Sequence, residues 1–339
     1  MRRDEAEFAA LVERHRRELR VHCYRMLGSF DEAEDLVQET FLRAWKGIDA
    51  FEGRASVRAW LYRIATNACL DFLDGRARRV LPQDLRPPSD ASVGLPPRTD
   101  IPWLQPFPDR LAPDDTEPGA AAVQRETIEL AFLAAIQHLP PRQRAALLLR
   151  DVLGWRPGEI APVLEASVAS VNSALQRARA TLREHLPARR ADWAPSTPPT
   201  AEERAVLRRY MDAMERADVA AVAALLAEDV RTAMPPWPMW FRGRDAVVAA
   251  LRASFAPDGM GYRFRMLPTR ANWQPAVATY VRTGEHPDHH AFAISVLRIE
   301  HGLVAEATAF HDTHLFPAFD LPPRLPADDV SGSAPSPRM

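Results

Sequence analysis

The stretch GEIAPVLEASVASVNSALQRARATLRE, residues 158–184, has the pattern of a short helix, a tight turn and a second, longer helix. We predict the turn at residues 165–167 and place Ser167 at the cap of the second helix, where its hydroxyl oxygen can accept a backbone hydrogen bond. Five apolar residues of the second helix recur at spacings of three and four, which predicts one packing stripe. They are Val168, Val171, Leu175, Ala178 and Leu182.

The opposite face of this second helix is polar and suits contacts in a DNA major groove. Small hydroxyl groups allow close approach to phosphates, whereas glutamine and arginine can form paired hydrogen bonds with adenine and guanine edges. Residues 120–190 contain ten basic and six acidic residues, and this charge of +4 favours phosphate contacts. An ordinary helical hairpin stays an equal alternative, which Pro162 inside the first helix favours. The polar residues are Ser170, Ser173, Gln176 and Arg177.

Composition divides the 339-residue chain into several parts, and its length suits two or three domains. Helical periodicity covers residues 5–80 and returns over residues 121–187. Residues 82–118 contain ten prolines and a net charge of −4, which indicates an extended linker over residues 81–120.

The C-terminal third has a different pattern. Residues 200–320 begin with helical periodicity and then change to alternating, strand-like runs at 290–300 and 303–316. The proline-rich tail, residues 321–339, is predicted to be disordered. The sequence therefore predicts a multidomain chain with two all-α modules followed by an α+β domain.

Several classes of protein are excluded by simple counts. Two cysteines, Cys23 and Cys69, are too few for a disulfide framework or a zinc finger. The charged N-terminus lacks the apolar core of a signal peptide, and no segment reaches the ~20 apolar residues of a membrane helix. We expect a soluble, cytoplasmic protein without membrane contact, and no residue pattern calls for a cofactor or a metal ion.

The first helical segment has an acidic part and a basic part. In SFDEAEDLVQETFLRAW (29–45), helical spacing gathers Asp35, Gln38 and Glu39 on one exposed surface. Residues 54–79 are basic, with six arginines against two aspartates. Aromatic side chains among arginines can stack unpaired bases and hold a single strand. Core packing is the alternative for Trp60, Leu61 and Ile64, and for Leu61 and Ile64 it is preferred.

Three motifs together resemble bacterial RNA polymerase sigma factors of the extracytoplasmic-function type, within the sigma-70 family. They are DEAEDLVQETFLRAW (31–45), ASVRAWLYRIATNACLD (55–71) and LPPRQRAALLLRDVLGW (139–155), the last followed by the helix-turn-helix. The resemblance covers both helical modules in the order and spacing of the family. It implies that the partners are core RNA polymerase and promoter DNA.

The resemblance also implies roles for individual residues. Asp35, Gln38 and Glu39 would dock on the polymerase clamp. The loop FEGRAS (51–56) and the next helix would open the minus-ten element, capture a flipped base and hold the strand. Residues implied there are Phe51, Arg58, Trp60, Arg63, Asn67, Arg76 and Arg79. Those implied for the minus-thirty-five element are Ser170, Ser173, Gln176, Arg177 and, nearer the packing stripe, Arg179.

The linker is long enough for such a role. The two promoter elements lie about 70 Å apart, since two turns of duplex separate them at ~34 Å each. A 37-residue linker extends to roughly 120 Å. Its negative charge also suits the polymerase channel through which the family's linker passes.

The C-terminal segment resembles the SnoaL-like, ketosteroid-isomerase-like cone fold, in which helices close over a curved sheet. The resemblance rests on EERAVLRRYMDAMERADVAAVAALLAEDVRTAM (202–234), WFRGRDAVVAALR (240–252) and the strands that follow. It implies an apolar pocket for a small-molecule ligand, with acid–base candidates but no transferable catalytic motif. The candidates are Tyr210, Asp245, His311 and Asp312.

Two other groups in this segment have structural alternatives. Five histidines lie in GEHPDHHAF and HDTH, but no carboxylate or cysteine accompanies them at a diagnostic metal spacing, so exposed histidines are preferred. They are His286, His289, His290, His311 and His314. Trp237, Met239, Trp240 and Phe241 are expected to line or cap the cone, or to belong to its core.

Three functions are compatible with parts of these patterns. The first is a sigma factor whose fused C-terminal domain modulates activity. The second is a one-component regulator whose helix-turn-helix binds an operator while the cone binds a ligand, and the third is an enzyme with a DNA-binding extension. The motifs at 31–45 and 55–71 favour the first, because a one-component regulator needs neither.

The linker contains WLQPFPD, residues 103–109, in which apolar side chains stand among prolines. Burying a phenylalanine-sized side chain stabilises a protein by about 1.5 to 3 kcal/mol, so linkers rarely keep such groups exposed. Neighbouring prolines lower the entropy that docking costs. We therefore predict that Trp103 and Phe107 form an interdomain latch against the cone or the first module. A cluster without a partner is the alternative.

Overall fold

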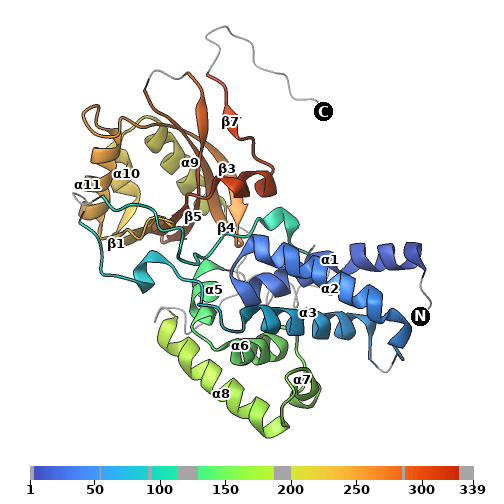
Figure 1. Ribbon diagram of the computed structural model, residues 1–339. Coiled ribbons are helices and arrows are strands. Elements are labelled where there is room, and N and C mark those ends of the chain that lie inside the picture. The colour runs from blue at the N-terminus through green and yellow to red at the C-terminus, as the bar shows by residue number, and fades with distance from the viewer. Residues whose placement is uncertain are drawn as a thin grey trace.

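The computed structural model describes residues 4–53, 55–90, 94–113, 129–186, 200–284 and 287–327. We call residues 4–80 the first helical module, 81–113 the linker, 129–186 the second helical module and 200–327 the cone domain. In Figure 1 the cone domain lies above the two helical modules, and the linker passes between them. Among the described residues, no helix is long and apolar enough to span a membrane.

The first helical module contains the helices α1 (Glu5–Leu27), α2 (Phe30–Gly47) and α3 (Val57–Leu73), with a short 3-10 turn after α2. Each begins at an acidic or hydroxyl cap whose side chain accepts a backbone hydrogen bond: Asp4, Ser29 and Ser56. Gly28 ends α1 with φ of 71°, a left-handed conformation that suits glycine. The predicted helical segment is confirmed.

The second helical module contains α5 (Leu130–Gln137), α6 (Pro141–Leu147) with a following π turn, α7 (Pro157–Val163) and α8 (Val168–His185). The predicted helix-turn-helix is confirmed, and Ser167 caps α8 by accepting a 3.1 Å bond from the Ser170 amide. The packing stripe is confirmed except at Val168, which is 47% exposed. The stripe meets its neighbours only from Val171 onward.

The cone domain contains α9 (Ala201–Glu215), α10 (Val219–Leu225), α11 (Arg244–Phe255) and one sheet. Strands run in the order β2-β1-β6-β5-β4-β3, with β7 beside β5. Among the strands of the described residues, β1 and β6 pair in parallel and the other pairs are antiparallel. The strands are β1 (Leu226–Ala233), β2 (Trp240–Arg242), β3 (Arg263–Ala271), β4 (Gln274–Arg282), β5 (His289–Glu300), β6 (Leu303–Phe310) and β7 (Arg324–Leu325).

Two expectations about this domain need correction. The predicted strand at 303–316 is too long, because β6 ends at Phe310 and residues 313–319 form a 3-10 helix. The Asp312 carboxylate caps that helix, and Pro317 inside it has no amide hydrogen to donate to a sheet. Ordered structure also continues past residue 321, since β7 pairs with β5. The rest of the predicted tail, from residue 328, lies outside the described residues.

Strand β4 of the sheet is buried on both faces. On β4, Val277 packs with α9 and α11 in the core of the cone, whereas Ala276, Ala278 and Tyr280 belong to a second core. That second core also contains buried side chains of both helical modules and Phe107 of the linker. The cone domain therefore shares a continuous apolar core with the rest of the chain.

The linker is extended, as predicted, and it packs against the cone domain. The part of the linker that leads away from the first helical module, which we call its outward arm, follows the loop before β2. The Ser89 amide donates to the carbonyl of Trp240, the first residue of β2, at 2.7 Å. The Arg98 amide donates to the Pro236 carbonyl at 2.9 Å. In Figure 1 this arm reaches the edge of the cone near α11 and β1 before it returns to the helical modules.

Candidate functional site

The polar face of α8 is open to solvent. Ser170, Ser173, Gln176 and Arg177 are all exposed. Arg179 is held differently, because its guanidinium donates two hydrogen bonds to Asp151 at 2.6 and 3.1 Å. These bonds raise the pKa of Arg179 and hold its side chain against the π turn that follows α6. Four of the five residues predicted for the minus-thirty-five element therefore share one free surface.

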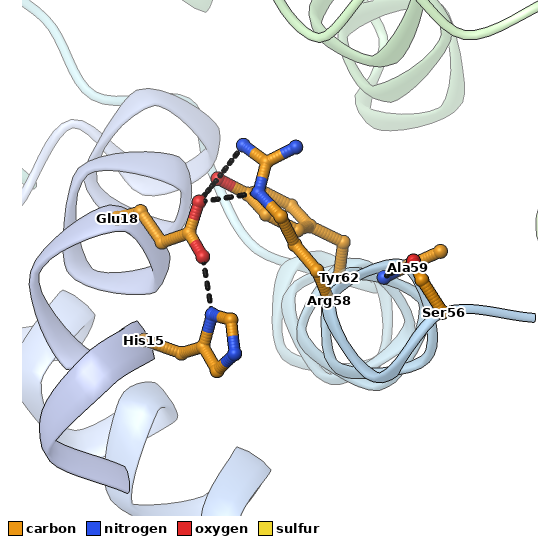
Figure 2. Close-up of polar contacts among 6 residues, drawn as sticks. All are labelled: His15, Glu18, Ser56, Arg58, Ala59 and Tyr62. Atoms are coloured by element: carbon orange, nitrogen blue, oxygen red, sulfur yellow. Dashed lines mark hydrogen bonds and ion pairs between the residues drawn. The ribbon is translucent and has the colours of Figure 1, made fainter. Parts of the chain in front are cut away.

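Arg58 lies in a polar cluster between α1 and α3 (Figure 2). Its Nε donates to Glu18 at 2.7 Å, and the Tyr62 hydroxyl donates to the same carboxylate oxygen at 3.1 Å. The Arg58 guanidinium also lies 4.9 Å from the centre of the Tyr62 ring. Arg58 thus joins two helices within the module.

Of the other residues predicted for the minus-ten element, Trp60, Arg63 and Asn67 lie on α3. Trp60 is half-buried, with its ring centre 4.8 Å from that of Phe51 in the preceding loop. Arg63 is exposed on the same helix, and Asn67 is half-buried one turn further on. The two tilted rings therefore pack the loop against α3, and Arg63 is a solvent-facing cation on the same helix.

Arg76 and Arg79 follow α3 and lie close to other parts of the chain. The Arg76 guanidinium lies 3.7 Å from the centre of the Phe72 ring. Arg79 pairs with Glu32 at 2.5 Å and donates to the Trp103 carbonyl at 2.6 Å, and only 15% of its side chain is exposed. Arg79 is therefore bound inside the protein between α2 and the linker.

The predicted acidic surface lies on α2. Asp35 and Gln38 are exposed, whereas Glu39 accepts a 2.7 Å bond from Arg43. Arg43 also donates to Asp71 of α3 at 2.9 Å, and the bonds to Glu39 and Asp71 raise its pKa. The charge of Glu39 is therefore partly neutralised, and Asp35 is the more open carboxylate.

The aromatic side chains of the linker motif are buried. Trp103 is 9% exposed, and its indole nitrogen donates to the Arg98 carbonyl at 2.7 Å. Phe107 is fully buried, with its ring centre 4.9 Å from that of Tyr24 and 5.9 Å from that of Phe30. Phe107 therefore packs directly on the first helical module.

A hydrogen-bonded knot joins three parts of the chain around Phe107. Asn272, between β3 and β4, accepts from the Phe107 amide at 2.9 Å, and its own amide donates to the Phe107 carbonyl at 2.9 Å. The Asn272 side-chain nitrogen donates to the Tyr24 hydroxyl at 2.8 Å, and that hydroxyl donates to the Gln105 carbonyl at 2.7 Å. Burial raises the pKa of Tyr24, so it stays a neutral donor. We refer to Tyr24, Gln105, Phe107 and Asn272 as the knot.

The Gln105 side chain extends the knot to the first helical module and to the cone domain. Its oxygen accepts from the Ser29 hydroxyl at 2.7 Å, and its nitrogen donates to Asp31 at 2.8 Å and to Asp312 at 3.2 Å. Ser29 and Asp31 belong to the start of α2, whereas Asp312 follows β6. One linker amide therefore ties the first helical module to the cone domain.

Arg144 of α6 fastens the second helical module to the first. It is buried, and its guanidinium donates to the Met26 carbonyl of α1 and to carbonyl oxygens of Ile136, Gln137 and Leu139. Burial lowers the pKa of Arg144 to about 9. Apart from Phe107, none of these residues was predicted from the sequence, because Arg144, Tyr24, Gln105 and Asn272 stand in no local pattern that marks such contacts.

The acid–base candidates of the cone domain do not form a constellation. Tyr210 lies on α9 and burial raises its pKa to about 12, while Asp245 is exposed on α11. His311 packs edge-on against Trp237 and Phe292, and burial lowers its pKa to about 4. Among the described residues, no hydrogen bond joins any two of Tyr210, Asp245, His311 and Asp312.

The remaining described histidines lie partly buried and partly exposed in the cone domain, so the expectation of exposed histidines is wrong for His289. His289 is buried, His290 and His314 are exposed, and His286 lies outside the described residues. No three histidine, cysteine or acidic side chains of the described part of the chain form a metal-binding group.

The loop that carries Trp237 also meets the linker. Phe241 is buried in the core of the cone, whereas the Trp240 indole donates to the Arg86 carbonyl at 2.8 Å. The Met239 sulfur accepts from the Leu95 amide at 3.4 Å.

Comparison with protein-family models gives three matches along the chain. Sigma-70 region 2 matches residues 11–79, sigma-70 region 4 matches residues 129–182, and a SnoaL-like domain matches residues 207–307. These ranges coincide with the first helical module, the second helical module and the cone domain.

Whole proteins agree with these matches. The chain is 45% identical over 323 residues to the ECF RNA polymerase sigma factor SigG of Mycobacterium tuberculosis, covering 94% of this chain and 85% of SigG. It is 32% identical to SigW of Bacillus subtilis over 54% of this chain and 90% of SigW. The crystal structure of M. tuberculosis SigJ shares the fold, with a TM-score of 0.60 and 24% identity, covering 94% of this chain and all of that one.

The two sigma regions, in order and with the predicted helix-turn-helix, decide against a one-component regulator. The chain belongs to the extracytoplasmic-function RNA polymerase sigma factors, carries a C-terminal SnoaL-like domain, and directs transcription initiation.

Proposed function

We propose that the arrangement described above is a closed form of this sigma factor, in which the cone domain and linker restrain the two helical modules. The observation that carries this proposal is the knot together with Arg144. Both sets of contacts are buried, and they join segments that must separate to reach promoter elements about 70 Å apart. The linker can span that distance once it leaves the cone domain.

Opening would expose surfaces that the closed form uses internally. The linker covers Arg79 and fills the space beside Phe30, so its release would return these groups to solvent. The face of α8 is already exposed. Promoter binding by the second helical module would therefore need less rearrangement than strand capture by the first.

A transcription assay with core polymerase tests the closed form. Asn272→Ala removes bonds to Tyr24 and Phe107, and a coupling of 1 to 3 kcal/mol corresponds to a change of roughly 5- to 150-fold. We expect core affinity to rise by about fivefold or more, measured by titrating core polymerase at fixed sigma concentration. Gln83→Ala, an exposed linker amide, is the matched control. Equal affinity for both variants would show that the knot imposes no restraint.

Docking to core polymerase is assigned to Asp35, Gln38 and Glu39 of α2. Asp35 and Gln38 are exposed and lie on an acidic helix, which suits a basic partner surface. Replacing Asp35 and Gln38 by alanine is expected to weaken core binding without changing the unfolding midpoint. Asp74→Ala, an exposed acidic residue of the same module, should bind core normally. An unchanged affinity of the double variant would move the docking surface elsewhere.

We also propose that the cone domain regulates rather than catalyses, and that the protein acts in the cytoplasm, beside RNA polymerase. The support is that, in the described part of the chain, no hydrogen bond links the acid–base candidates to one another, while Asn272 and Asp312 hold the linker. His311→Ala should leave regulation by the knot intact. Loss of the difference between wild type and Asn272→Ala in a His311→Ala background would argue for a chemical role of His311.

A further inference from the structure

A cavity of about 740 Å³ lies where the linker meets the cone domain. Its walls are linker residues 108–110, the α9 segment around Arg208, the end of β3, the start of β4 and Phe319. This volume falls within the ~300 to 1,000 Å³ of small-molecule sites. The cavity is therefore large enough for a small organic molecule.

The cavity is strongly basic. Four of its twelve lining residues are arginines, and Asp109 is the one acidic residue, which leaves a formal charge of +3. Basic residues make up 43 of 339 in the whole chain, and the chain has a net charge of −2. The arginines are thus concentrated here, from three separate parts of the sequence: Arg110, Arg204, Arg208 and Arg270.

The same cavity has apolar walls. Leu207 is buried and belongs to the core of the cone, while Trp273 and Phe319 line the space with aromatic surface. The Arg270 guanidinium lies 5.4 Å from the centre of the Trp273 ring. Cations and apolar surface side by side select a ligand that has an anionic group and an apolar body.

The protein itself supplies a carboxylate to this wall. Asp109 Oδ1 accepts from the Trp273 amide at 2.8 Å, and Oδ2 lies 3.2 Å from Arg270 Nε. The linker backbone continues this contact, because Pro108 forms an antiparallel bridge with Ala271. The Trp273 amide and the Arg270 guanidinium thus already bind one carboxylate, that of Asp109, and the arginines of α9 are the cations that remain for a ligand.

From this geometry we propose that the cavity is a binding site for an amphipathic organic anion, with a carboxylate or phosphate head on an apolar body. The head contacts the arginines of α9, and the body lies on Trp273 and Phe319. Since Asp109 and Arg110 belong to the linker, two and three residues after Phe107, a bound ligand touches the segment that forms the knot. Because ligand binding is measured directly, a negative result would overturn this proposal without bearing on the proposed closed form.

Calorimetric titration of the full chain with dodecanoate, below its micelle concentration, tests the proposal. We expect saturable binding of one molecule per chain. Arg208→Glu is expected to weaken it by about tenfold or more, because an attraction becomes a repulsion inside the cavity. The matched control is Arg209→Glu, the neighbouring exposed arginine of α9, which does not line the cavity. It should bind within about twofold of wild type.

Further arms define the ligand class. Dodecyl phosphate in place of dodecanoate distinguishes a phosphate from a carboxylate head. Dodecanol and inorganic phosphate should each bind at least about tenfold more weakly than the full amphiphile, since each lacks one half of the recognised chemistry. Equal binding by either one, or equal losses in the two arginine variants, would overturn the proposal.

The other outcome to separate is a polyanion surface. If dodecanoate does not bind, while Arg208→Glu weakens binding to random duplex DNA more than Arg209→Glu does, the arginines contact nucleic acid and the small-molecule proposal is wrong. Circular dichroism and the unfolding midpoint of both variants confirm that each is folded.

Discussion

Arginines on the basic surface of the first helical module and on the polar, proposed DNA-contacting face of α8 have very different surroundings. Arg58 bonds to Glu18, Arg76 lies on Phe72, and Arg79 is bound by Glu32 and a linker carbonyl. On α8, Arg177 and its polar neighbours are exposed. An arginine on a predicted nucleic-acid surface can thus be part of the scaffold, and only its contacts decide which role it has.

The difference has a consequence for activation. The second helical module leaves its proposed DNA face open to solvent, whereas the first ties Arg58 and Arg79 into ion pairs and covers Arg79 with the linker. The following variants break or sharpen this contrast.

The largest expected effect is that of Phe107→Ala. A fully buried phenylalanine replaced by alanine typically costs about 3 to 5 kcal/mol of unfolding free energy. The same change should loosen the linker and raise binding of the first module to a single-stranded minus-ten oligonucleotide. Urea unfolding and fluorescence anisotropy measure the two effects. Leu85→Ala, an exposed apolar linker residue, is the control, and equal behaviour of the two would contradict the covering role of Phe107.

Arg177→Ala should act on recognition alone. We expect a loss of about 1 to 3 kcal/mol in promoter affinity, concentrated at one base pair, with no change in the unfolding midpoint. Competition binding with promoter variants measures it. Arg183→Ala, near the end of the same helix, should not change base discrimination. An equal loss on random DNA would reassign Arg177 to a phosphate contact.

His22 gives the first helical module a sensitivity to acid. It is buried against Thr66, with a 2.9 Å bond, and burial followed by the charges of Arg25 and Arg58 lowers its pKa to about 3. The unfolded chain therefore takes up a proton below about pH 6.5 that the folded chain refuses. Stability should fall as the pH drops from about 6.5 toward 3, by up to about 1.4 kcal/mol per pH unit.

His22→Gln removes this titration and keeps a hydrogen-bonding group near Thr66. Urea unfolding of both proteins at pH 7, 6 and 5 should give a smaller decrease for the variant. Parallel decreases would show that His22 is not the group responsible.

The smallest expected effect is at Arg79. Replacing it by alanine should lower the unfolding free energy by about 1 kcal/mol, because a partly buried ion pair and a hydrogen bond are lost. In the closed form, binding to the minus-ten strand should not change. Arg63→Ala, on the exposed face of α3, should weaken binding to the minus-ten strand and leave the unfolding free energy unchanged. If Arg79→Ala weakens strand binding more than Arg63→Ala, the contrast drawn here is wrong for the first module.

The elements that follow from local pattern were predictable from sequence. The helix-turn-helix, its Ser167 cap and the strand at 290–300 depend on spacing and capping within a few residues. The knot could not be predicted in this way, since Tyr24 and Asn272 are 248 positions apart and neither stands in a distinctive motif. WLQPFPD indicated that Phe107 needs a buried site, but the identity of the residues around it required the fold.

Burial of β4 on both faces has a thermodynamic consequence for the whole chain. Because Tyr280 and its neighbours complete a core that includes both helical modules, separating the cone domain would uncover apolar surface on each side. Domains joined in this way are expected to melt together, so calorimetry should record one cooperative heat-absorption peak instead of three. The regulator and the machinery it regulates would then share one melting temperature.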